Sequence, residues 1–372
     1  MPWRVSSTMS ERHQFVLLAS QPNANIRALC RQFGISSATA YKWRDRFKNE
    51  GVTGLADRSR RPHHSPRKTA TMIEEAVLCL RRKHPAWGGR KLKQRLLDLG
   101  QQVPSPSTIT AILKRNQMID AAESLKHQSF LRFEHDAPND LWQMDFKGDF
   151  AVAGGRCYPF TILDDHSRFA LAVLACPKIS TEIARPLLIT VFRRYGLPLR
   201  ITCDNGPPWG SSNSKYTKLG VWLMRLGIAV SHSRPHHPQT QGKDERFHRT
   251  LQAEVLRYLV PEDLAMCQNH FEQWRHVYNT ERPHEALGLQ VPATRYQPSL
   301  RPYPERLPAI EYAPTDIVRK VRGYGHIKYK GREHHISSAF AGLCVALRFT
   351  NTDGLLDVYF SQHHIGQINL TD

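Results

Sequence analysis

Three acidic residues occupy positions that suit a catalytic metal site. Asp145 lies on the polar side of an alternating segment, Asp204 ends a short apolar run, and Glu245 begins a long amphipathic stretch. Carboxylate oxygens with no thiolate or imidazole nearby select hard cations such as Mg²⁺ or Mn²⁺. Two such ions about 3.5–4 Å apart can activate an attacking oxygen and stabilise the leaving oxygen of a phosphoryl displacement. The three residues are therefore candidate ligands of a two-metal site.

The same residues also have an ordinary interpretation. Any protein of this length contains isolated acids, and Glu245 can pair with Arg249, four residues later on the same helix. Taken alone, the stretch around Glu245 favours such a solvated helix face. The metal site becomes the better interpretation only if the fold brings the other carboxylates beside it.

The elements around these acids predict an α/β core, residues 139–295, with a mixed five-stranded sheet. Apolar or alternating runs predict strands at residues 141–150, 158–163, 169–175, 199–203 and 228–231. Helices are expected at residues 182–195, 216–226 and 264–278 and over the stretch containing Glu245. In that stretch Phe247, Leu251 and Val255 form an apolar stripe. Because ligands bind at strand ends in such sheets, a site is expected at Asp145 and Asp204.

The charge of the chain indicates an anionic partner. Its 372 residues carry a formal net charge of +19, and residues 1–128 hold 23 Lys and Arg against 9 Asp and Glu. Such an excess favours nucleic acid. No apolar run is long enough to span a membrane, and the N-terminus has no apolar signal-peptide core, so we expect a cytoplasmic protein with no membrane partner.

The cysteines and histidines do not indicate a structural metal. The seven cysteines are scattered with no CxxC pair, and the four His doublets have no Cys at ligand spacing. This distribution favours reduced thiols and predicts no zinc site.

Residues 1–56 predict a DNA-binding helix-turn-helix module. Helices are expected at residues 11–20, 26–33 and 38–47, with Gly34 ending the second and Ser36 or Ser37 capping the third. The third helix would present four residues to DNA: Ser37, Thr39, Lys42 and Arg46. A three-helix protein-binding bundle is the alternative, but the basic charge favours DNA.

A second helix-turn-helix module is expected at residues 71–120, after a basic linker at residues 57–70 that contains Arg60 and Arg61. Ser105 can cap its third helix, with Pro106 at the first helical position. Its candidate DNA contacts are Arg90, Lys91, Ser107, Thr108, Lys114 and Arg115. Two such modules in tandem can recognise a longer DNA site than one.

The remaining segments are two connectors and a C-terminal module. Residues 121–138 show little periodicity, and residues 296–315 form a Pro-rich linker. Short β runs over residues 316–372, with a turn at Asp353-Gly354, predict a small β-barrel.

Four motifs in this order closely resemble bacterial insertion-sequence transposases of the retroviral-integrase type, the DDE superfamily. They are Trp142-Gln-Met-Asp145, Leu163-Asp-Asp-His-Ser-Arg168, Thr202-Cys-Asp-Asn-Gly-Pro-Pro-Trp209 and His237-Pro-Gln-Thr-Gln-Gly-Lys-Asp-Glu-Arg-Phe-His248. The resemblance extends over nearly the whole chain.

The resemblance implies a ribonuclease H-like core whose catalytic triad is Asp145, Asp204 and Glu245 with two Mg²⁺ or Mn²⁺ ions. It implies a DNA transposase of the bacterial nucleoid that nicks the ends of a mobile element and joins the freed 3′-hydroxyls to target DNA. Partners would be double-stranded DNA, from the terminal repeats and the target, and further copies of the chain. Lys243, His248 and Arg249 become candidate contacts to the DNA end.

The chain also departs from the family pattern. The zinc-binding N-terminal domain of retroviral integrases is replaced by the helix-turn-helix pair. Asp244 occupies a position where an apolar residue is expected, and since a helix turns about 100° per residue its side chain should diverge from that of Glu245. Asp165, Ser167 and Arg168 match a family motif but receive no role. The rival functions are a non-catalytic DNA-binding protein, such as a repressor or an inactive transposase copy, and a structure-specific nuclease.

Overall fold

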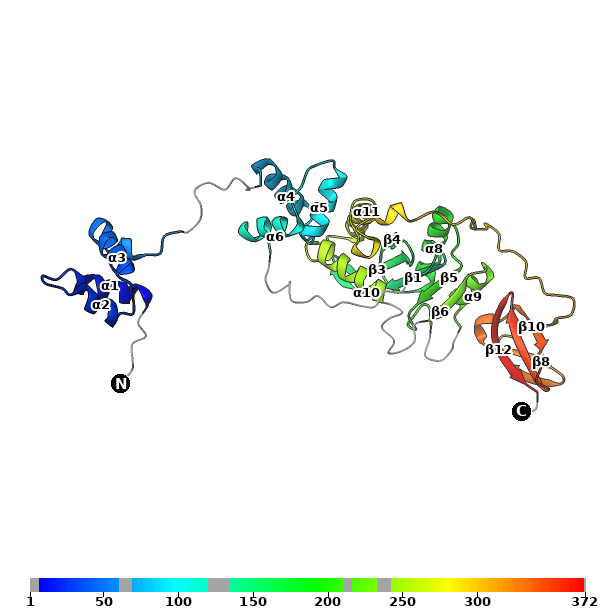
Figure 1. The fold of residues 1–372 in the computed structure, drawn as a ribbon. Helices are drawn as coiled ribbons and strands as arrows, with labels where there is room; N and C mark the ends of the chain where they lie inside the picture. The colour runs from blue at the N-terminus through cyan, green and yellow to red at the C-terminus, as the bar shows by residue number, and fades with distance from the viewer. Residues whose placement is uncertain (1–6, 60–68, 120–133, 211–215, 233–241, 371–372) are drawn as a thin grey trace. The chain divides into compact units, whose positions relative to one another are not determined.

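The computed structural model describes residues 7–59, 69–119, 134–210, 216–232 and 242–370. The chain divides into two compact units, Met1–Lys68 and Thr69–Asp372, whose elements are drawn in Figure 1. The candidate DNA contacts Arg60 and Arg61 lie outside the described residues, as does the Pro/His-rich segment 233–238.

The first unit has the three helices that the sequence predicts. They are α1 (Thr8–Ala19), α2 (Ile26–Gln32) and α3 (Ser37–Glu50), followed by the 3₁₀ turn η1 (Gly51–Leu55). The Ser36 side chain accepts a hydrogen bond from the Thr39 amide at 3.2 Å and so caps α3. Phe15, Val16, Trp43 and Leu55 form the buried core. The helix-turn-helix prediction is confirmed in its elements.

The second unit begins with the other predicted helical module. Its helices are α4 (Thr71–Lys83), α5 (Gly89–Asp98) and α6 (Pro106–Arg115). Ser105 caps α6 by accepting from the Thr108 amide at 3.2 Å, and Pro106 begins the helix as predicted. Trp87, Leu92, Ile109 and Ile112 are fully buried between the three helices.

A mixed sheet of six strands forms the core, one strand more than the sequence predicts. The strands are β1 (Leu141–Phe146), β2 (Phe150–Val152), β3 (Gly155–Asp164), β4 (Ala170–Cys176), β5 (Arg200–Cys203) and β6 (Ala229–His232). The predicted strand 141–150 is wrong in its extent. Residues 147–149 leave it, and Phe150–Val152 pairs as a hairpin with the start of β3 around Gly154, whose φ is +81°.

Helices cover both faces of this sheet (Figure 1). The strand order is β2-β3-β1-β5-β6, with β4 on β3, and β1, β5 and β6 run parallel. Helices α8 (Thr181–Tyr195) and α9 (Lys218–Arg225) pack on one face over Trp142 and Phe160. On the other face lie α10 (Gly242–Leu251), the π-helical turn η3 (Gln252–Leu256) and α11 (Leu264–Thr280). The predicted stripe Phe247, Leu251 and Val255 belongs to this second core.

The C-terminal module is strand-rich, but its described strands do not form a closed barrel. Strands β7 (Ile317–Lys320), β10 (Cys344–Phe349), β11 (Leu355–Phe360) and β12 (His363–Asn369) form an open sheet in the order β12-β11-β10-β7. Strands β8 (His326–Tyr329) and β9 (Arg332–His335) form a separate hairpin. The predicted barrel is therefore not confirmed. Nowhere in the described ranges is a helix long and apolar enough to cross a membrane.

A buried histidine follows α11 and is held without charge. The His284 ring packs edge-on against Tyr278 at 4.6 Å, and its Nε2 accepts a hydrogen bond from Arg282 at 3.3 Å. Burial, then the charges of Arg282 and Lys91, lower the pKa of His284 well below its ordinary value. The folded state therefore takes up this proton less readily than the unfolded chain does.

We predict that His284 makes the second unit sensitive to acid. Because its folded pKa is depressed, its stabilising contribution is complete above about pH 6.5 and is lost below it, by about 1.4 kcal/mol per pH unit. Thermal unfolding of the His284→Gln variant between pH 7.5 and 5 should show a flatter fall in Tm than the wild type. The exposed His276 on α11 provides the control, and His276→Gln should keep the wild-type slope. Equal slopes in all three proteins would contradict the assignment.

Candidate active site

Parallel strand pairing brings two of the three candidate carboxylates together. On β1, Gln143 pairs in register with Thr202 on β5, and both strands run in the same direction. Asp145 and Asp204 each lie two residues beyond that pair, so they follow side by side at the carboxyl ends of the strands. This is the edge at which an α/β sheet places its ligands.

Among the described residues, neither carboxylate forms an ion pair with a Lys or Arg side chain. Burial, and then the charge of Asp204, raise the pKa of Asp145 to about 7. Burial also raises the pKa of Asp204, although a backbone hydrogen bond from Gly206 and the His232 ring partly oppose this. The buried Oδ1 of Asp204 has no hydrogen-bond partner among the residues that the structure describes. A cation between the carboxylates would relieve both the repulsion and the unpaired oxygen.

The loop after β5 leaves room for the Asp204 carboxylate. A Cβ atom at Gly206 would lie 2.8 Å from Asp204 Oδ2, so only glycine leaves this approach open. The loop is anchored by Trp209, whose ring lies 5.9 Å from Phe146 and 5.6 Å from Phe160 between centroids. These apolar contacts tie the segment that carries Asp204 to the strand that carries Asp145.

The structure does not bring Glu245 to this pair. Its side chain is 64% exposed on α10, and its carboxylate lies 4.0 Å from Arg249, which is the ordinary helix pair that the sequence allows. The described residues contain no group of three or more Asp, Glu, His or Cys that could hold a metal ion. Asp244 and Glu245 diverge as the helical turn predicts, but in the opposite sense to the one expected: Asp244, only 3% exposed, is the buried residue, and Glu245 lies on the surface.

Asp244 introduces a further buried carboxyl at the start of α10. Burial first, then the charges of Asp145 and Asp165, raise its pKa well above the ordinary value, while Lys243 opposes the shift. Its Oδ1 is buried with no hydrogen-bond partner among the described residues. In the position where an apolar residue was expected, this chain therefore carries an acid that faces the carboxylates of the core.

His248 faces the sheet and not the side of the helix that carries Arg249, which corrects the grouping expected from the sequence. Its Nε2 lies 2.8 Å from the Thr161 hydroxyl, and its Nδ1 lies 3.8 Å from Asp145 Oδ2. Burial, then the charge of Lys147, lower the pKa of His248 to about 4. The apolar stripe accounts for this orientation. Phe247 and Leu251 pack against the sheet and bring His248 toward it, while Arg249 stays 54% exposed.

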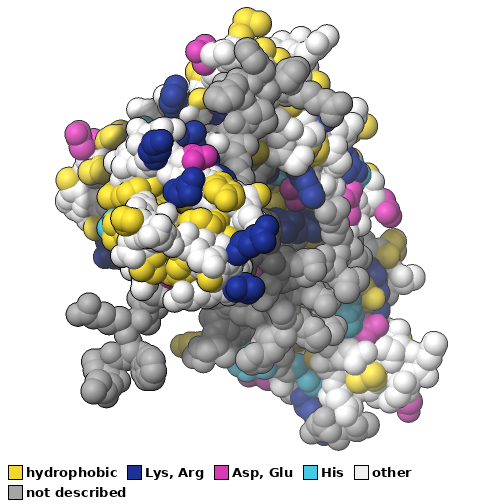
Figure 2. Space-filling view, turned by 60° about the vertical axis from the view of Figure 1, so that its left-hand side comes forward, with side chains coloured by type: hydrophobic (Ala, Val, Ile, Leu, Met, Phe, Trp, Pro, Cys, Tyr) yellow, Lys and Arg dark blue, Asp and Glu magenta, His cyan; other side chains and the backbone are white. Residues whose placement is uncertain are grey.

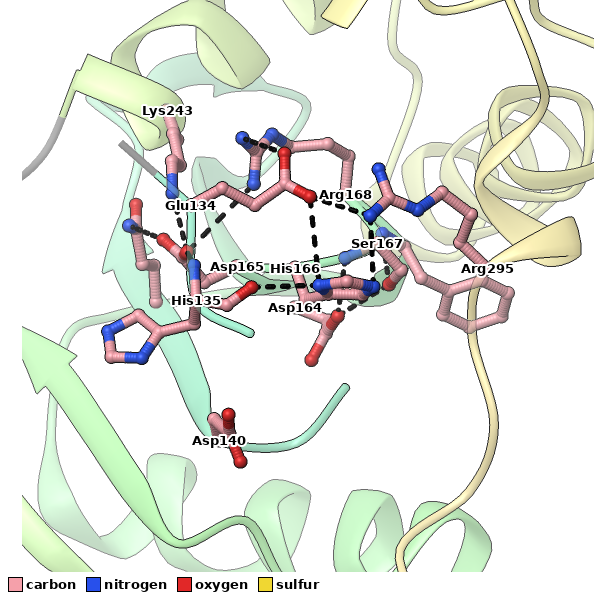
Figure 3. Close-up of polar contacts among 12 residues, drawn as sticks. Glu134, His135, Asp140, Asp164, Asp165, His166, Ser167, Arg168, Lys243 and Arg295 are labelled. Carbon is pink, nitrogen blue, oxygen red and sulfur yellow. Dashed lines mark hydrogen bonds and ion pairs between the residues drawn. The ribbon is translucent and has the colours of Figure 1, made fainter. Parts of the chain in front are cut away.

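A second polar cluster surrounds the turn after β3 (Figure 3). Asp164 accepts hydrogen bonds from the Ser167 amide at 2.8 Å and from the Asn139 amide at 2.8 Å. Arg168 lies 3.7 Å from Glu134, and Lys243 forms a 2.5 Å ion pair with Asp165. The sequence marks this turn by the motif at residues 163–168 but gives no indication of its partners Glu134 and Arg295, which form an ion pair at 2.6 Å.

The candidate DNA contacts of the first unit lie on α3. Ser37 and Lys42 are exposed, and Thr39 and Arg46 are half-buried. The Lys42 and Arg46 cations lie 5.0 Å and 5.1 Å from the centroid of the Trp43 ring. The helix thus presents basic side chains around a buried aromatic anchor.

The candidates of the second module are more engaged with the protein itself. They are Arg90, Lys91, Ser107, Thr108, Lys114 and Arg115. Lys114 is exposed, whereas Arg115 pairs with Glu74. Burial, then Arg282, lower the pKa of Lys91 to about 8. Arg90 lies 3.8 Å from Glu285, and both Ser107 and Thr108 bond to the Ser105 side chain in the helix cap.

Comparisons with protein families match most of the chain in pieces. Residues 135–238 and 226–292 match two integrase core domains, and residues 316–372 match the C-terminal domain of IS481 family transposases. Residues 11–63 match a helix-turn-helix domain, and residues 39–113 match a homeodomain-like domain.

Known relatives include proteins of two bacterial insertion elements. A 31.7 kDa protein of element IS407 from Burkholderia multivorans is 27% identical over 42% of this chain, and a 39.2 kDa protein of element IS476 from Xanthomonas euvesicatoria is 29% identical over 42%. The aligned parts cover 55% and 44% of those two proteins, so the chain spans about half the length of the curated relatives it matches.

Viral proteins and a solved viral structure are also similar. The Gag-Pol polyprotein of baboon endogenous virus is 26% identical over 58% of this chain and 13% of its own length. The catalytic core domain of HTLV-2 integrase, solved in complex with magnesium, is 18% identical, with 43% of this chain and 98% of that one covered at a TM-score of 0.35. Because integrase core, IS481 C-terminal and helix-turn-helix matches follow one another along the sequence, the chain belongs to the insertion-sequence transposases of the retroviral-integrase-like superfamily.

Proposed function

We propose that the protein is a DNA transposase that binds the ends of a mobile element, nicks them and joins the freed 3′-hydroxyls to target DNA. The observation that supports this most is the pair of Asp145 and Asp204 at the ends of two parallel strands. A protein that only binds DNA has no use for two carboxylates that raise each other's free energy in a partly buried site. Nothing in the geometry favours the rival function of a non-catalytic DNA-binding protein.

The residues present suit divalent cations. Asp145 and Asp204 supply oxygen ligands only, and the buried Asp204 Oδ1 lacks a partner among the described residues. Together with Glu245 they would hold two Mg²⁺ or Mn²⁺ ions. Bound there, the ions would supply Lewis-acid activation and charge neutralisation for phosphoryl transfer. The chain's own contribution is to orient the carboxylates, and the His248–Thr161 contact fixes the ring that borders Asp145.

Glu245 is the ligand whose position must change. On α10 its carboxylate lies 4.0 Å from Arg249, one helical turn further along the helix, and it forms no metal-binding group with Asp145 and Asp204 among the described residues. We propose that metal and the DNA end bring it into the site. A phosphate of the DNA end that binds Arg249 would draw this guanidinium away from the Glu245 carboxylate, because Arg binds phosphate in bidentate form. Glu245 would then be free to turn toward the metal.

The two helical modules supply the DNA contacts in this proposal. Lys42 and Arg46 on α3, and Lys114 on α6, are basic side chains on the helices that a helix-turn-helix module presents to DNA. In the face shown in Figure 2, Lys and Arg side chains border exposed hydrophobic ones. The chain would act as an oligomer of identical copies, because joining two element ends needs two active sites.

The proposed chemistry predicts that the acids are needed for joining but not for binding. Purified protein is incubated with DNA that carries the element's own ends, with Mg²⁺ or with EDTA. Asp204→Asn and Glu245→Gln should each lower strand transfer at least about a hundredfold, because several kcal/mol of charge stabilisation are lost. Affinity for the DNA ends should stay within about twofold. Glu305, an exposed acid paired with Arg193, is the control, and Glu305→Gln should join DNA as the wild type does.

Retained joining in Glu245→Gln would remove that residue from the site. Wild-type protein that binds the ends tightly but never joins them, in either Mg²⁺ or Mn²⁺, would instead support the non-catalytic rival.

The helix-turn-helix assignment predicts a change in salt dependence. Lys42→Ala and Arg46→Ala should each weaken binding to the element's ends and reduce the slope of log affinity against log salt by about 1, the value for one lost phosphate contact. Fluorescence anisotropy between about 50 and 200 mM salt measures this slope. Arg193→Ala in the second unit should leave the slope unchanged. A wild-type slope in both α3 variants would exclude that helix as the DNA-contacting element.

A further inference from the structure

We propose that Asp165 is a positioning residue that connects the two elements carrying Asp145 and Glu245. The proposal rests on the proposed function in one respect, namely that those two residues are metal ligands. Its structural part, a buried carboxylate that holds the first turn of α10 to strand β1, does not depend on any activity.

The Asp165 carboxylate receives partners from three separate segments (Figure 3). Gln143 Nε2 on β1 donates to its Oδ1 at 2.7 Å. Lys243 Nζ at the start of α10 lies 2.5 Å from its Oδ2, and the His135 amide donates to the same oxygen at 3.0 Å. Asp165 is only 1% exposed, so these contacts replace water almost completely. The carboxylate is therefore well satisfied, in contrast to those of Asp204 and Asp244.

Each of the two side chains that contact Asp165 lies two residues before a proposed metal ligand. Gln143 lies two residues before Asp145, and on a strand residues i and i+2 point to the same face. Lys243 lies two residues before Glu245, in the first turn of α10. One carboxylate thus fixes both backbones within two residues of a ligand. A change in its position would alter the distance between β1 and the helix start.

The turn that carries Asp165 is itself rigidly held. The Asp165 amide donates to the Leu141 carbonyl at 3.0 Å, which attaches the turn to the beginning of β1. Asp164 closes the turn by accepting from the Ser167 amide, and the Arg168 amide donates back to the Asp164 carbonyl at 3.0 Å. Arg168 adopts a φ of +61° there, a conformation that needs such support. The turn that carries Asp165 is therefore attached to the sheet by contacts that do not involve α10.

The rest of α10 is held in a different way. Phe247 and Leu251 bury their side chains against the sheet, and these apolar contacts fix the body of the helix. They act about half a turn and nearly two turns beyond Glu245. Since buried ion pairs can often be replaced by apolar contacts without loss of stability, packing alone gives no reason for a Lys–Asp pair at the first turn. Orientation of the neighbouring residue gives one, because two hydrogen bonds and an ion pair to one carboxylate fix the position of the helix start more narrowly than apolar packing does.

The experiment compares five variants of the full chain. Lys243→Met keeps the length of the side chain and removes its charge, Asp165→Asn removes the opposite charge, and the double variant removes both. Ser167→Ala is the matched control, because it weakens the same turn through Asp164 but leaves every contact of Asp165 in place. Lys243→Arg tests rescue, since it restores a cation at the same position.

Two measurements are made on each variant. Hydrogen exchange of the amides of residues 246–251, without metal, reports how firmly the start of α10 is held. Isothermal titration with Mn²⁺ alone reports whether the carboxylates are positioned to bind it. Lys243→Met and Asp165→Asn should each raise exchange and weaken Mn²⁺ binding by about tenfold or more, the double variant should be no worse than either, and Ser167→Ala should change neither. Lys243→Arg should recover most of both properties.

The outcomes separate this inference from the proposed function. Folded Lys243→Met with wild-type exchange and wild-type Mn²⁺ affinity would overturn the positioning role, and it decides the question even if Asp165→Asn fails to fold. Faster exchange in Ser167→Ala equal to that of Lys243→Met would also overturn it, because the effect would then be general to the turn. If the wild type binds no Mn²⁺, the proposed metal site fails, while the exchange measurement still decides whether Asp165 holds α10.

Discussion

The repulsion between Asp145 and Asp204 is the constraint on which the rest of the core depends. Two carboxylates that border each other in a partly buried site favour separation, and only a rigid frame keeps them together. Parallel pairing of β1 with β5 provides that frame, and the stacked rings of Phe146, Phe160 and Trp209 lock the loop beyond it. The folded chain thus brings together two carboxylates that it pairs with no Lys or Arg among the described residues, and a divalent cation would stabilise both in their charged form.

In the first two turns of helix α10, some polar residues face the sheet and others face solvent. Its apolar stripe directs Asp244 and His248 toward the sheet and leaves Glu245 and Arg249 outside. The proposed third ligand is therefore available on the surface while an unexpected acid is buried next to it. Asp165, which binds both Gln143 and Lys243, limits how far this turn can move. In the proposed site, two carboxylates are fixed and the third, that of Glu245, would be guided as it approaches.

Local patterns in the sequence predict most of this architecture. Capping by Ser36 and Ser105 and the stripe on α10 each depend on neighbours within a few residues, and all three are confirmed. The pairing of Asp145 with Asp204 follows from strand order. The contacts of Asp165 could not be predicted, because Gln143 and Lys243 are distant in sequence and hydrogen-bond geometry appears only in the fold. For the same reason the open C-terminal sheet and the orientation of Glu245 required the structure.

Anomalous scattering from crystals of the protein grown with Mn²⁺ and DNA carrying the element's ends tests the central claim most directly. The account predicts manganese between Asp145 and Asp204, with Glu245 turned inward to complete the site and the Asp165–Lys243 contact intact. Manganese bound elsewhere, or no manganese at this pair in a complex whose DNA ends are in place, would contradict it.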